Sequence, residues 1–434
     1  MLAYRKIVCS ALALMLLSTT AMAQEPSRKE LPRTRIIPYP SAELAHKGSL
    51  EKQRFMEPIT EWTSEEEGIL RGKFIYPFAW IDRHIFIRIE GVMQPYELLI
   101  NGRLAGGATN GFVATEFDIT KLSKEDGNVV ELRLLPRDGV AAIECFKHCE
   151  AKPTAYVVSQ PRLRVREVFW NTHKGMGGIA NIDFGVVMRN ETLNPKYSKL
   201  YYELYANDTL RLTGGHLDVS IDMHGVDTMR FGATISDTLL WRSGAPSMLS
   251  LRVENRIENR KSEVYDFAVA LRDLDYIDNT ILFINGEPIA LDWYDMEACS
   301  DIAEVQKVIE MGHNALRFGA GYVSEEVLTL CDREGVYVAL TTPINSSLSG
   351  ESRKRGGNPS NDPAWRKEYV ERAVALVETT DRHASVVAYY LAEDSANGIC
   401  LYEAYLAMKR VSGSRPVFYL DGGNEWNSDY LLND

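Results

Sequence analysis

The sequence contains little cysteine, no excess of positive charge and, after its first 23 residues, no long apolar run. Six cysteines in 434 residues are too few for a scaffold built on disulfides. A formal net charge of −12 argues against nucleic acid or anionic lipid as a partner, because both attract basic surfaces. With 45% hydrophobic residues, the chain has a globular composition and the length of about two to three domains.

The first residues are typical of a secretory signal. Arg5 and Lys6 precede an apolar run over residues 7–17, and small residues end the segment at Ala23. A membrane anchor is the alternative, but a spanning helix needs about 20 apolar residues. We therefore expect cleavage of residues 1–23 and a periplasmic or extracellular protein without a membrane span.

The cysteines that would follow a cleaved signal are odd in number, so they cannot all be paired. Cys145 and Cys149 flank His148, but two sulfurs and one imidazole lack the fourth ligand of a zinc site. A local Cys145–Cys149 disulfide is favoured over a metal site, and two free thiols are the other option. The sequence predicts no metal site and no cofactor.

The first two thirds of the chain show short strands without helical periods. Residues 85–90 alternate apolar and polar side chains, and Asn101-Gly102 is a strong hairpin-turn signal. For residues 24–160 the pattern predicts a jelly-roll β-sandwich, and for residues 161–272 an immunoglobulin-like β-sandwich.

From residue 273 to residue 434, strands alternate with helical periods. This rhythm is typical of a parallel sheet covered by helices, and a closed barrel of that kind needs eight strands. Five strands are predicted, at residues 288–291, 315–318, 336–340, 386–391 and 416–420. The expected fold class is therefore multidomain β plus α/β, ending in a partial TIM-type barrel of about five strands.

Several segments in the right order resemble glycoside hydrolase family 2, which contains β-galactosidases, β-mannosidases and β-glucuronidases. The segments that carry the resemblance are residues 87–92, 100–103, 111–112, 116–120, 241–246, 283–289, 314–317, 330–338, 382–386 and 414–417. They correspond to the family's sugar-binding jelly roll, its immunoglobulin-like domain and the first five units of its barrel. The resemblance covers nearly the whole chain that follows the signal.

The resemblance implies a retaining mechanism, which needs two carboxyl groups about 5 Å apart. The family's Gly-Asn-Glu-Ser run aligns with residues 392–395, so Asp394 takes the acid/base position and Glu393 replaces an asparagine. Adjacent residues of a strand point to opposite faces, so Glu393 and Asp394 are not expected to serve one site. The strand of the nucleophile would lie beyond residue 434.

Three further residues are candidates for substrate binding. Trp293 and Tyr294 follow the expected first barrel strand, where a sugar could stack on them, although core packing is the alternative. Arg317 matches the family arginine that supports the nucleophile. Since that nucleophile is absent from this chain, we expect Arg317 to pair with another carboxylate of the half barrel.

Three interpretations follow. The favoured one is a catalytically inactive relative that binds a β-linked glycan or another protein. The second is a hydrolase in which Asp394 is the acid and the nucleophile comes from outside this chain, and the third is a non-functional gene fragment. An open barrel leaves strand edges uncovered, which predicts a protein partner or a homo-oligomer at that edge.

Overall fold

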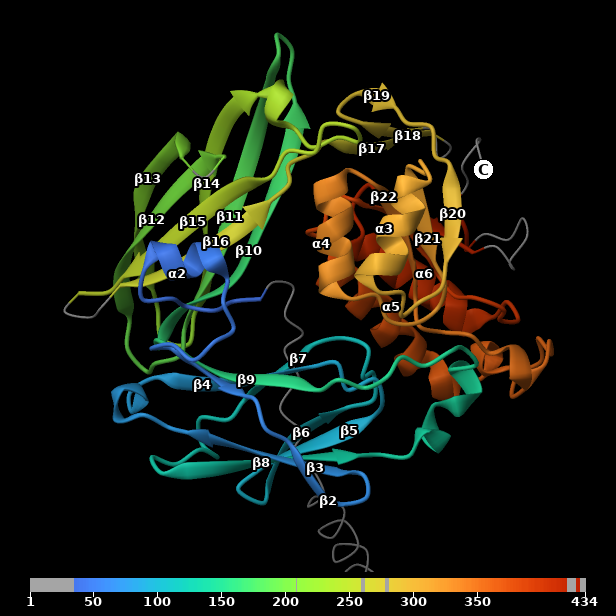
Figure 1. Cartoon of the computed structure of the whole chain (residues 1–434), viewed down its shortest axis with the longest axis horizontal. Helices are drawn as coiled ribbons and strands as arrows, with labels where there is room; N and C mark the ends of the chain where they lie inside the picture. Colours follow the sequence, from blue (N-terminus) through green and yellow to red (C-terminus); the bar gives the residue numbers. More distant parts are fainter. Residues whose placement is uncertain (1–34, 208, 259–261, 278–280, 420–426, 430–434) are drawn as a thin grey trace, which may run out of the picture.

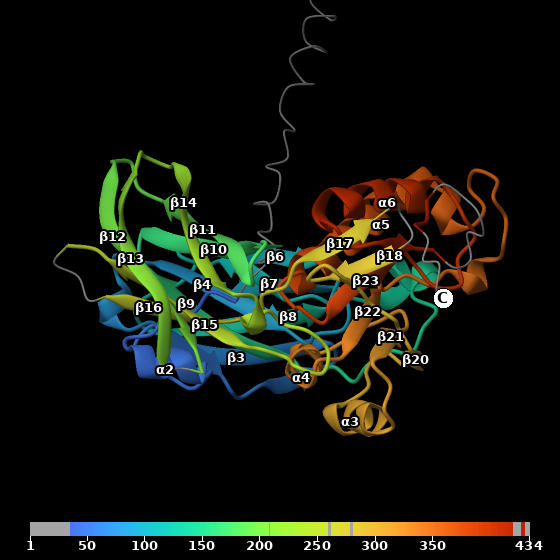
Figure 2. The ribbon, with the colours of Figure 1, turned by 90° about the horizontal axis from the view of Figure 1, so that it is seen from above.

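The structure is a computed structural model that describes residues 35–207, 209–258, 262–277, 281–419 and 427–429. The expected signal at residues 1–23 lies outside this part of the chain. Two β-sandwiches and a parallel βα unit make up the described molecule, which confirms the predicted fold class. The second sandwich and the βα unit lie side by side, and both contact the first sandwich (Figures 1 and 2).

The first sandwich, of the predicted jelly-roll type, consists of two antiparallel sheets. One sheet has the order β1-β9-β4-β7 and the other the order β2-β3-β8-β5-β6. The strands are β1 Met56–Ile59, β2 Thr63–Glu66, β3 Ile69–Ile75, β4 His84–Glu90, β5 Tyr96–Ile100, β6 Arg103–Ala108, β7 Thr115–Asp118, β8 Gly127–Leu134 and β9 Thr154–Gln160. Asn101 and Gly102 have φ angles of 52° and 76°, so the predicted tight turn joins β5 to β6.

The second sandwich packs a sheet of order β10-β11-β14 against one of order β13-β12-β15-β16. Its strands are β10 Leu163–Lys174, β11 Ile179–Asn190, β12 Lys196–Ala206, β13 Leu210–Ile221, β14 Val226–Ser236, β15 Leu249–Arg256 and β16 Glu263–Val269. The short helix α2 (Ala42–Lys47) lies beside β16, because Tyr39 exchanges two backbone hydrogen bonds with Val264. The residues that enter the first sandwich therefore also cover the second.

A small antiparallel sheet leads into the βα unit. It consists of β17 Leu274–Ile277, β18 Ile281–Ile284 and β19 Glu287–Pro288. The prediction of a first barrel strand at residues 288–291 is wrong. Pro288 pairs back onto β18, and Ile289 and Leu291 pack into an apolar cluster between this small sheet and the parallel strands. The first parallel strand follows at Trp293–Met296.

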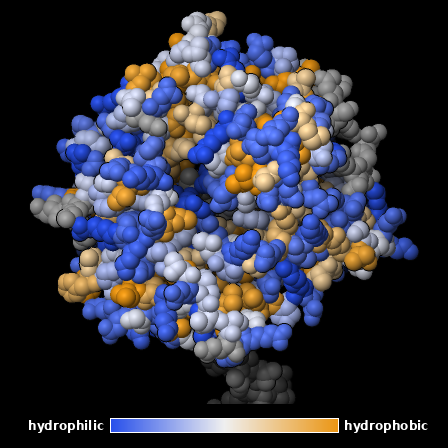
Figure 3. Space-filling model, viewed as in Figure 1, coloured by the Kyte–Doolittle hydropathy of each residue, from blue (hydrophilic) through white to orange (hydrophobic). Residues whose placement is uncertain are grey.

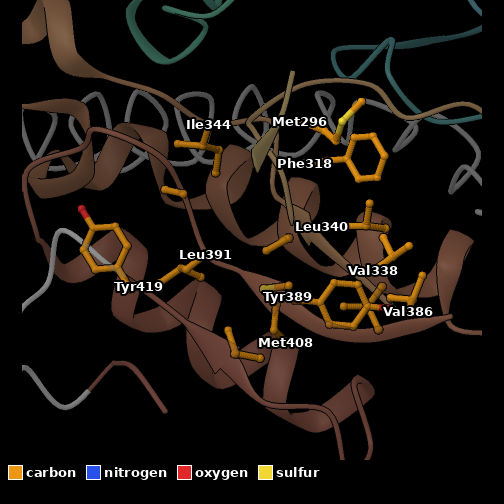
Figure 4. Packing of buried hydrophobic residues seen from close by; sticks show 14 of the residues in the cluster. Met296, Phe318, Val338, Leu340, Ile344, Val386, Tyr389, Leu391, Met408 and Tyr419 are labelled. Carbon is orange, nitrogen blue, oxygen red and sulfur yellow. The ribbon is translucent and has the colours of Figure 1, made fainter. Parts of the chain in front are cut away.

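The parallel sheet has five strands in the order β20-β21-β22-β23-β24. Its elements are β20 Trp293–Met296, α3 Ile302–Glu310, β21 Ala315–Phe318, α4 Glu325–Glu334, β22 Tyr337–Thr341, α5 Arg366–Thr380, β23 Val386–Tyr390, α6 Ile399–Val411 and β24 Val417–Phe418. One face of the strands packs against the helices through alternate apolar residues such as Phe318, Leu340 and Tyr389 (Figure 4). No closed barrel forms within the described residues, as the strand count predicted.

The surface is mainly hydrophilic on the face drawn in Figure 3, with hydrophobic residues in small groups. None of the described helices is long and apolar enough to cross a membrane.

Candidate active site

A cleft with a volume of about 530 Å³ lies at the carboxyl ends of the parallel strands. This is the end at which barrel enzymes place their catalytic residues, because the loops that follow the strands meet there. The end of every strand from β20 to β23 contributes to the lining, and so does a segment that follows the first sandwich's strand β8. The cleft thus combines two parts of the chain that are far apart in the sequence.

Asp394 and Glu393 both line this cleft, contrary to the expectation that they face opposite sides of a strand. The physical reason is that β23 ends at Tyr390, before the two acids. Asp394 has a φ of 42°, a left-handed backbone conformation that is uncommon for a residue other than glycine. That turn ends the strict alternation of a strand and brings the second carboxylate to the same side as the first.

Glu393 is held by the loop after β21. Its Oε2 accepts the backbone N–H of Ala320 at 3.1 Å. Gly319 lies beside this carboxylate, since a Cβ atom there would stand 3.4 Å from Oε1 of Glu393, in van der Waals contact. Asp394 is exposed, and its nearest hydrogen-bond donor is the side-chain amide of Asn345, at 3.5 Å from Oδ2. The acid/base position is therefore open to solvent.

Arg317 pairs with a carboxylate of the half barrel, as expected. Its guanidinium donates from Nε to Oδ1 of Asp295 at 2.5 Å and from Nη2 to Oδ2 at 2.8 Å. These hydrogen bonds to Asp295 raise the pKa of Arg317 above its ordinary value. The guanidinium also lies 5.5 Å from the ring centroid of Tyr390, within the range of a cation–π contact.

Asp295 was not predicted, because the first strand was placed five residues too early. With β20 at Trp293–Met296, the alternation in that strand points Trp293 and Asp295 to one face and Tyr294 and Met296 to the other. A strand that starts at Trp293 would have placed Asp295 at its carboxyl end, beside Arg317.

Trp293 and Tyr294 lie within β20 rather than after it, so the expected position behind the first strand is wrong. Neither side chain lines the cleft. Trp293 packs against buried Ala339, Ala388 and Phe418, and Tyr294 packs among the residues of the helix-facing core. Both aromatic residues thus take the core role that the sequence left as the alternative.

The segment from Arg137 to Cys149 forms one wall of the cleft and is here called the sandwich arm. Cys145, Phe146 and Lys147 of the arm line the cleft. Its backbone joins the barrel, since the Asn345 N–H donates to the carbonyl of Ile143 at 2.9 Å and the Cys145 N–H to the carbonyl of Asn345 at 3.0 Å. In Figure 1 the arm reaches from β8 to the loops that precede α5.

Buried charges fix the sandwich arm to helix α5. Glu144 accepts a hydrogen bond of 2.5 Å from Arg372, whose side chain is fully buried. Arg372 also donates to Glu368 and to the carbonyl of Pro343, each at 2.8 Å. Burial and the neighbouring Arg137 lower the pKa of His148, so its neutral ring accepts a hydrogen bond of 2.7 Å from Arg137. Sequence patterns gave no sign of the contact between the arm and α5, because Glu144 and Arg372 are 228 residues apart.

The predicted Cys145–Cys149 disulfide is wrong. Cys149 is bonded to Cys299, 150 residues away in the loop after β20, and Cys145 is a free thiol. The bond ties the sandwich arm to the barrel across the rim of the cleft. A search of the described residues finds no group of three or more side chains placed to hold a metal ion.

A parallel βα unit behind two β-sandwiches, with carboxylates at the ends of its strands, has the architecture of a multidomain glycosidase. Residues 290–434 match the profile described as "Glycosyl hydrolases family 2, TIM barrel domain". Over these residues the chain is similar to the barrel domain of glycoside hydrolase family 2.

Curated relatives are β-galactosidases. The "Beta-galactosidase large subunit" of Lactobacillus acidophilus is 24% identical over 372 residues, which are 78% of this chain and 56% of that protein. The "Beta-galactosidase" of Priestia megaterium is 20% identical over 380 residues, covering 80% of this chain and 36% of that protein. The chain thus spans about half or less of the length of these relatives.

Solved structures share the fold. A putative β-galactosidase from Bacteroides fragilis superposes with a TM-score of 0.69 at 15% identity, covering 84% of this chain and 57% of that one. A β-D-glucuronidase from Dictyoglomus thermophilum gives a TM-score of 0.68 at 16% identity, covering 86% and 73%.

Proposed function

We propose that this chain is an exported glycan-binding member of family 2 that holds a β-linked glycan in the cleft without hydrolysing it. The observation that carries the proposal is the placement of the carboxylates. Asp394 follows β23 and Asp295 is the third residue of β20, with two strands between them, so the two strands that carry them are about 14 Å apart at about 4.8 Å per strand. Retaining glycosidases need about 5 Å between their two carboxyl groups, and inverting ones about 6.5–9.5 Å.

The other carboxylates are engaged in ways that suit binding better than turnover. Asp295 is held by both nitrogens of the Arg317 fork, and Glu393 accepts a hydrogen bond from Ala320. A nucleophile must approach the sugar from the face opposite to the acid.

Hydrolysis of aryl β-glycosides tests this proposal. We expect no turnover by the purified chain, together with saturable retention of a β-linked oligosaccharide on an affinity gel. Turnover that disappears in Asp394→Asn but persists in Glu51→Gln, an exposed site between α2 and β1, would contradict it. That result would support the second candidate, a hydrolase with Asp394 as the acid and a nucleophile from outside this chain. The exposure of Asp394 in the cleft favours this candidate.

Export is supported by the Cys149–Cys299 disulfide, because such bonds persist in oxidising compartments. Mass spectrometry of the protein from its native host should show the loss of residues 1–23 and one disulfide. A reduced chain that retains its first residues would contradict export.

We also propose that a second copy of the chain covers the open edge of the sheet. Among the described strands, β20 has a neighbour on one side only, and the outer backbone groups of such an edge strand can pair with another chain. Light scattering after size-exclusion chromatography should give twice the monomer mass, and a monomer at micromolar concentration would contradict this proposal.

A further inference from the structure

The cleft carries an excess of negative charge. Four carboxylates line it, from Asp295, Glu297, Glu393 and Asp394, against two cations, Arg317 and Lys147. The formal sum at neutral pH is therefore 2 − 4 = −2. A cleft with low-dielectric walls concentrates the field of such an excess, so it selects ligands by the sign of their charge.

Both cations of the cleft are already engaged. Arg317 makes the two hydrogen bonds to Asp295, and Nζ of Lys147 lies 3.8 Å from Oε2 of Glu297. Neither Glu393 nor Asp394 has a cationic partner within 4.0 Å among the described residues. The excess charge is thus located on two adjacent side chains at the end of β23.

These two carboxylates make few hydrogen bonds. One Glu393 oxygen accepts the N–H of Ala320, and Asp394 has only the long contact of 3.5 Å with Asn345. Ionised carboxylates are acceptors only, with about four lone-pair sites each. Both side chains therefore have capacity left for a ligand that donates hydrogen bonds.

A bare metal ion does not fit this arrangement. No three of the described carboxylates and other ligand side chains come close enough to hold one. The cleft is also far larger than an ion, and it includes the rings of Tyr390 and Phe146. An organic cation with polar groups and one apolar face suits the size and the lining of the cleft. Its charge can contact the carboxylates, and its apolar face can pack against the aromatic rings.

We infer that the cleft selects glycans that carry a protonated amino group, with Glu393 and Asp394 as the specificity-determining residues. This inference rests on the proposed glycan-binding function and names the class of sugar. An amino sugar with a free ammonium donates hydrogen bonds to both carboxylates and neutralises part of the excess charge. Uronic acids and sulfated sugars add charge of the same sign and are rejected.

Calorimetric titration with three tetrasaccharides of one β-1,4-linked backbone tests the inference. The units are glucosamine, N-acetylglucosamine and glucose, so that only the substituent at carbon 2 changes. We expect the glucosamine tetramer to bind at least about tenfold more tightly than the glucose tetramer, since a charge pair near a protein surface contributes about that factor. The preference should shrink in added salt and as the pH rises above the pKa of the sugar's amino group.

Variants locate the effect. In the double variant Glu393→Gln and Asp394→Asn, the two neutral tetramers should bind as before and the glucosamine preference should fall to about twofold or less. Glu51→Gln removes one negative charge outside the cleft and should keep the full preference.

Each contrary outcome has its own meaning. Equal binding of the glucose and glucosamine tetramers overturns the inference and leaves the glycan-binding function standing. A preference that survives in the double variant overturns the role of Glu393 and Asp394. Binding of none of the three tetramers overturns the proposed function itself.

Discussion

The carboxylates at the two ends of the parallel sheet differ in whether a cation accompanies them. At the amino ends, buried Asp332 contacts Nδ1 of His383 at 2.6 Å, and Glu325 contacts Nε2 at 3.3 Å. These residues line a small cavity of about 200 Å³ beside the second sandwich. At the carboxyl ends, Glu393 and Asp394 line a larger cleft, and no described residue gives them a cationic partner within 4.0 Å. The first arrangement stabilises the fold, and the second leaves charge available for a ligand.

The sandwich arm shows a second contrast, between a buried and an exposed charge within one segment. Glu144 is buried and paired with Arg372, whereas Lys147, three residues later, is exposed in the cleft wall. A buried charge that loses its partner is costly, whereas an exposed charge remains solvated. Substitutions should therefore affect stability at the framework positions and ligand binding at the cleft positions.

The largest effect is expected from Arg372→Met. This change leaves Glu144 and Glu368 without their main partner, and breaking a buried pair costs about 3–5 kcal/mol. Chemical denaturation followed by tryptophan fluorescence measures the loss. The double variant Arg372→Met and Glu144→Gln should recover part of it, and a change below about 1 kcal/mol in the single variant would contradict the framework role.

The next effect is a pH dependence of stability that arises from His383. Burial disfavours the charged ring, but Asp332 and then Glu325 overcome it and raise the pKa of His383 from 6.5 to about 9. The stabilisation is fully present below about pH 6.5 and is lost as the pH rises through about 9, with a maximum of about 3 kcal/mol.

Unfolding in urea between pH 6 and pH 9.5 measures this dependence. The variant His383→Gln should remove most of the downward slope with rising pH. An unchanged slope in that variant would assign the dependence to other groups.

A smaller effect is expected at the Arg317–Asp295 pair, because Asp295 is 69% exposed. Asp295→Asn should lower the free energy of unfolding by about 1 kcal/mol or less. The same variant frees the guanidinium in the cleft, so the glucosamine tetramer should bind more weakly. A loss of stability as large as that of Arg372→Met would contradict the distinction between cleft and framework.

The smallest effect on stability is expected from Glu393→Gln. The amide oxygen can still accept the N–H of Ala320, and the variant removes repulsion between neighbouring acids. The free energy of unfolding should therefore change by about 0.5 kcal/mol or less in thermal and chemical denaturation. Unfolding of this variant under native conditions would show that Glu393 belongs to the framework.

Local patterns were sufficient for most of the fold. The Asn101-Gly102 turn and the strands β21 and β22 all form where their sequences predict. Each of these signals depends on residues that are close together in the chain. The prediction placed the first barrel strand too early, because it assigned the apolar residues Ile289 and Leu291 to that strand. In the structure they pack against the small antiparallel sheet that precedes the parallel strands.

The candidate site was only partly predictable for a related reason. The family resemblance indicated Asp394, Glu393 and Arg317, all of which line the cleft. Sequence patterns could not indicate the sandwich arm, the Glu144–Arg372 pair or the Cys149–Cys299 bond, since these contacts join segments 150 or more residues apart. The shared orientation of the two acids depends on one backbone angle, at Asp394, for which the sequence contains no glycine signal.

A crystal structure of the chain soaked with the β-1,4-linked glucosamine tetramer tests the central claim most directly. The account predicts an uncleaved tetramer in the cleft, with an ammonium nitrogen within hydrogen-bond distance of Glu393 or Asp394. An empty cleft with ligand bound elsewhere, or a cleaved sugar in the cleft, would contradict it.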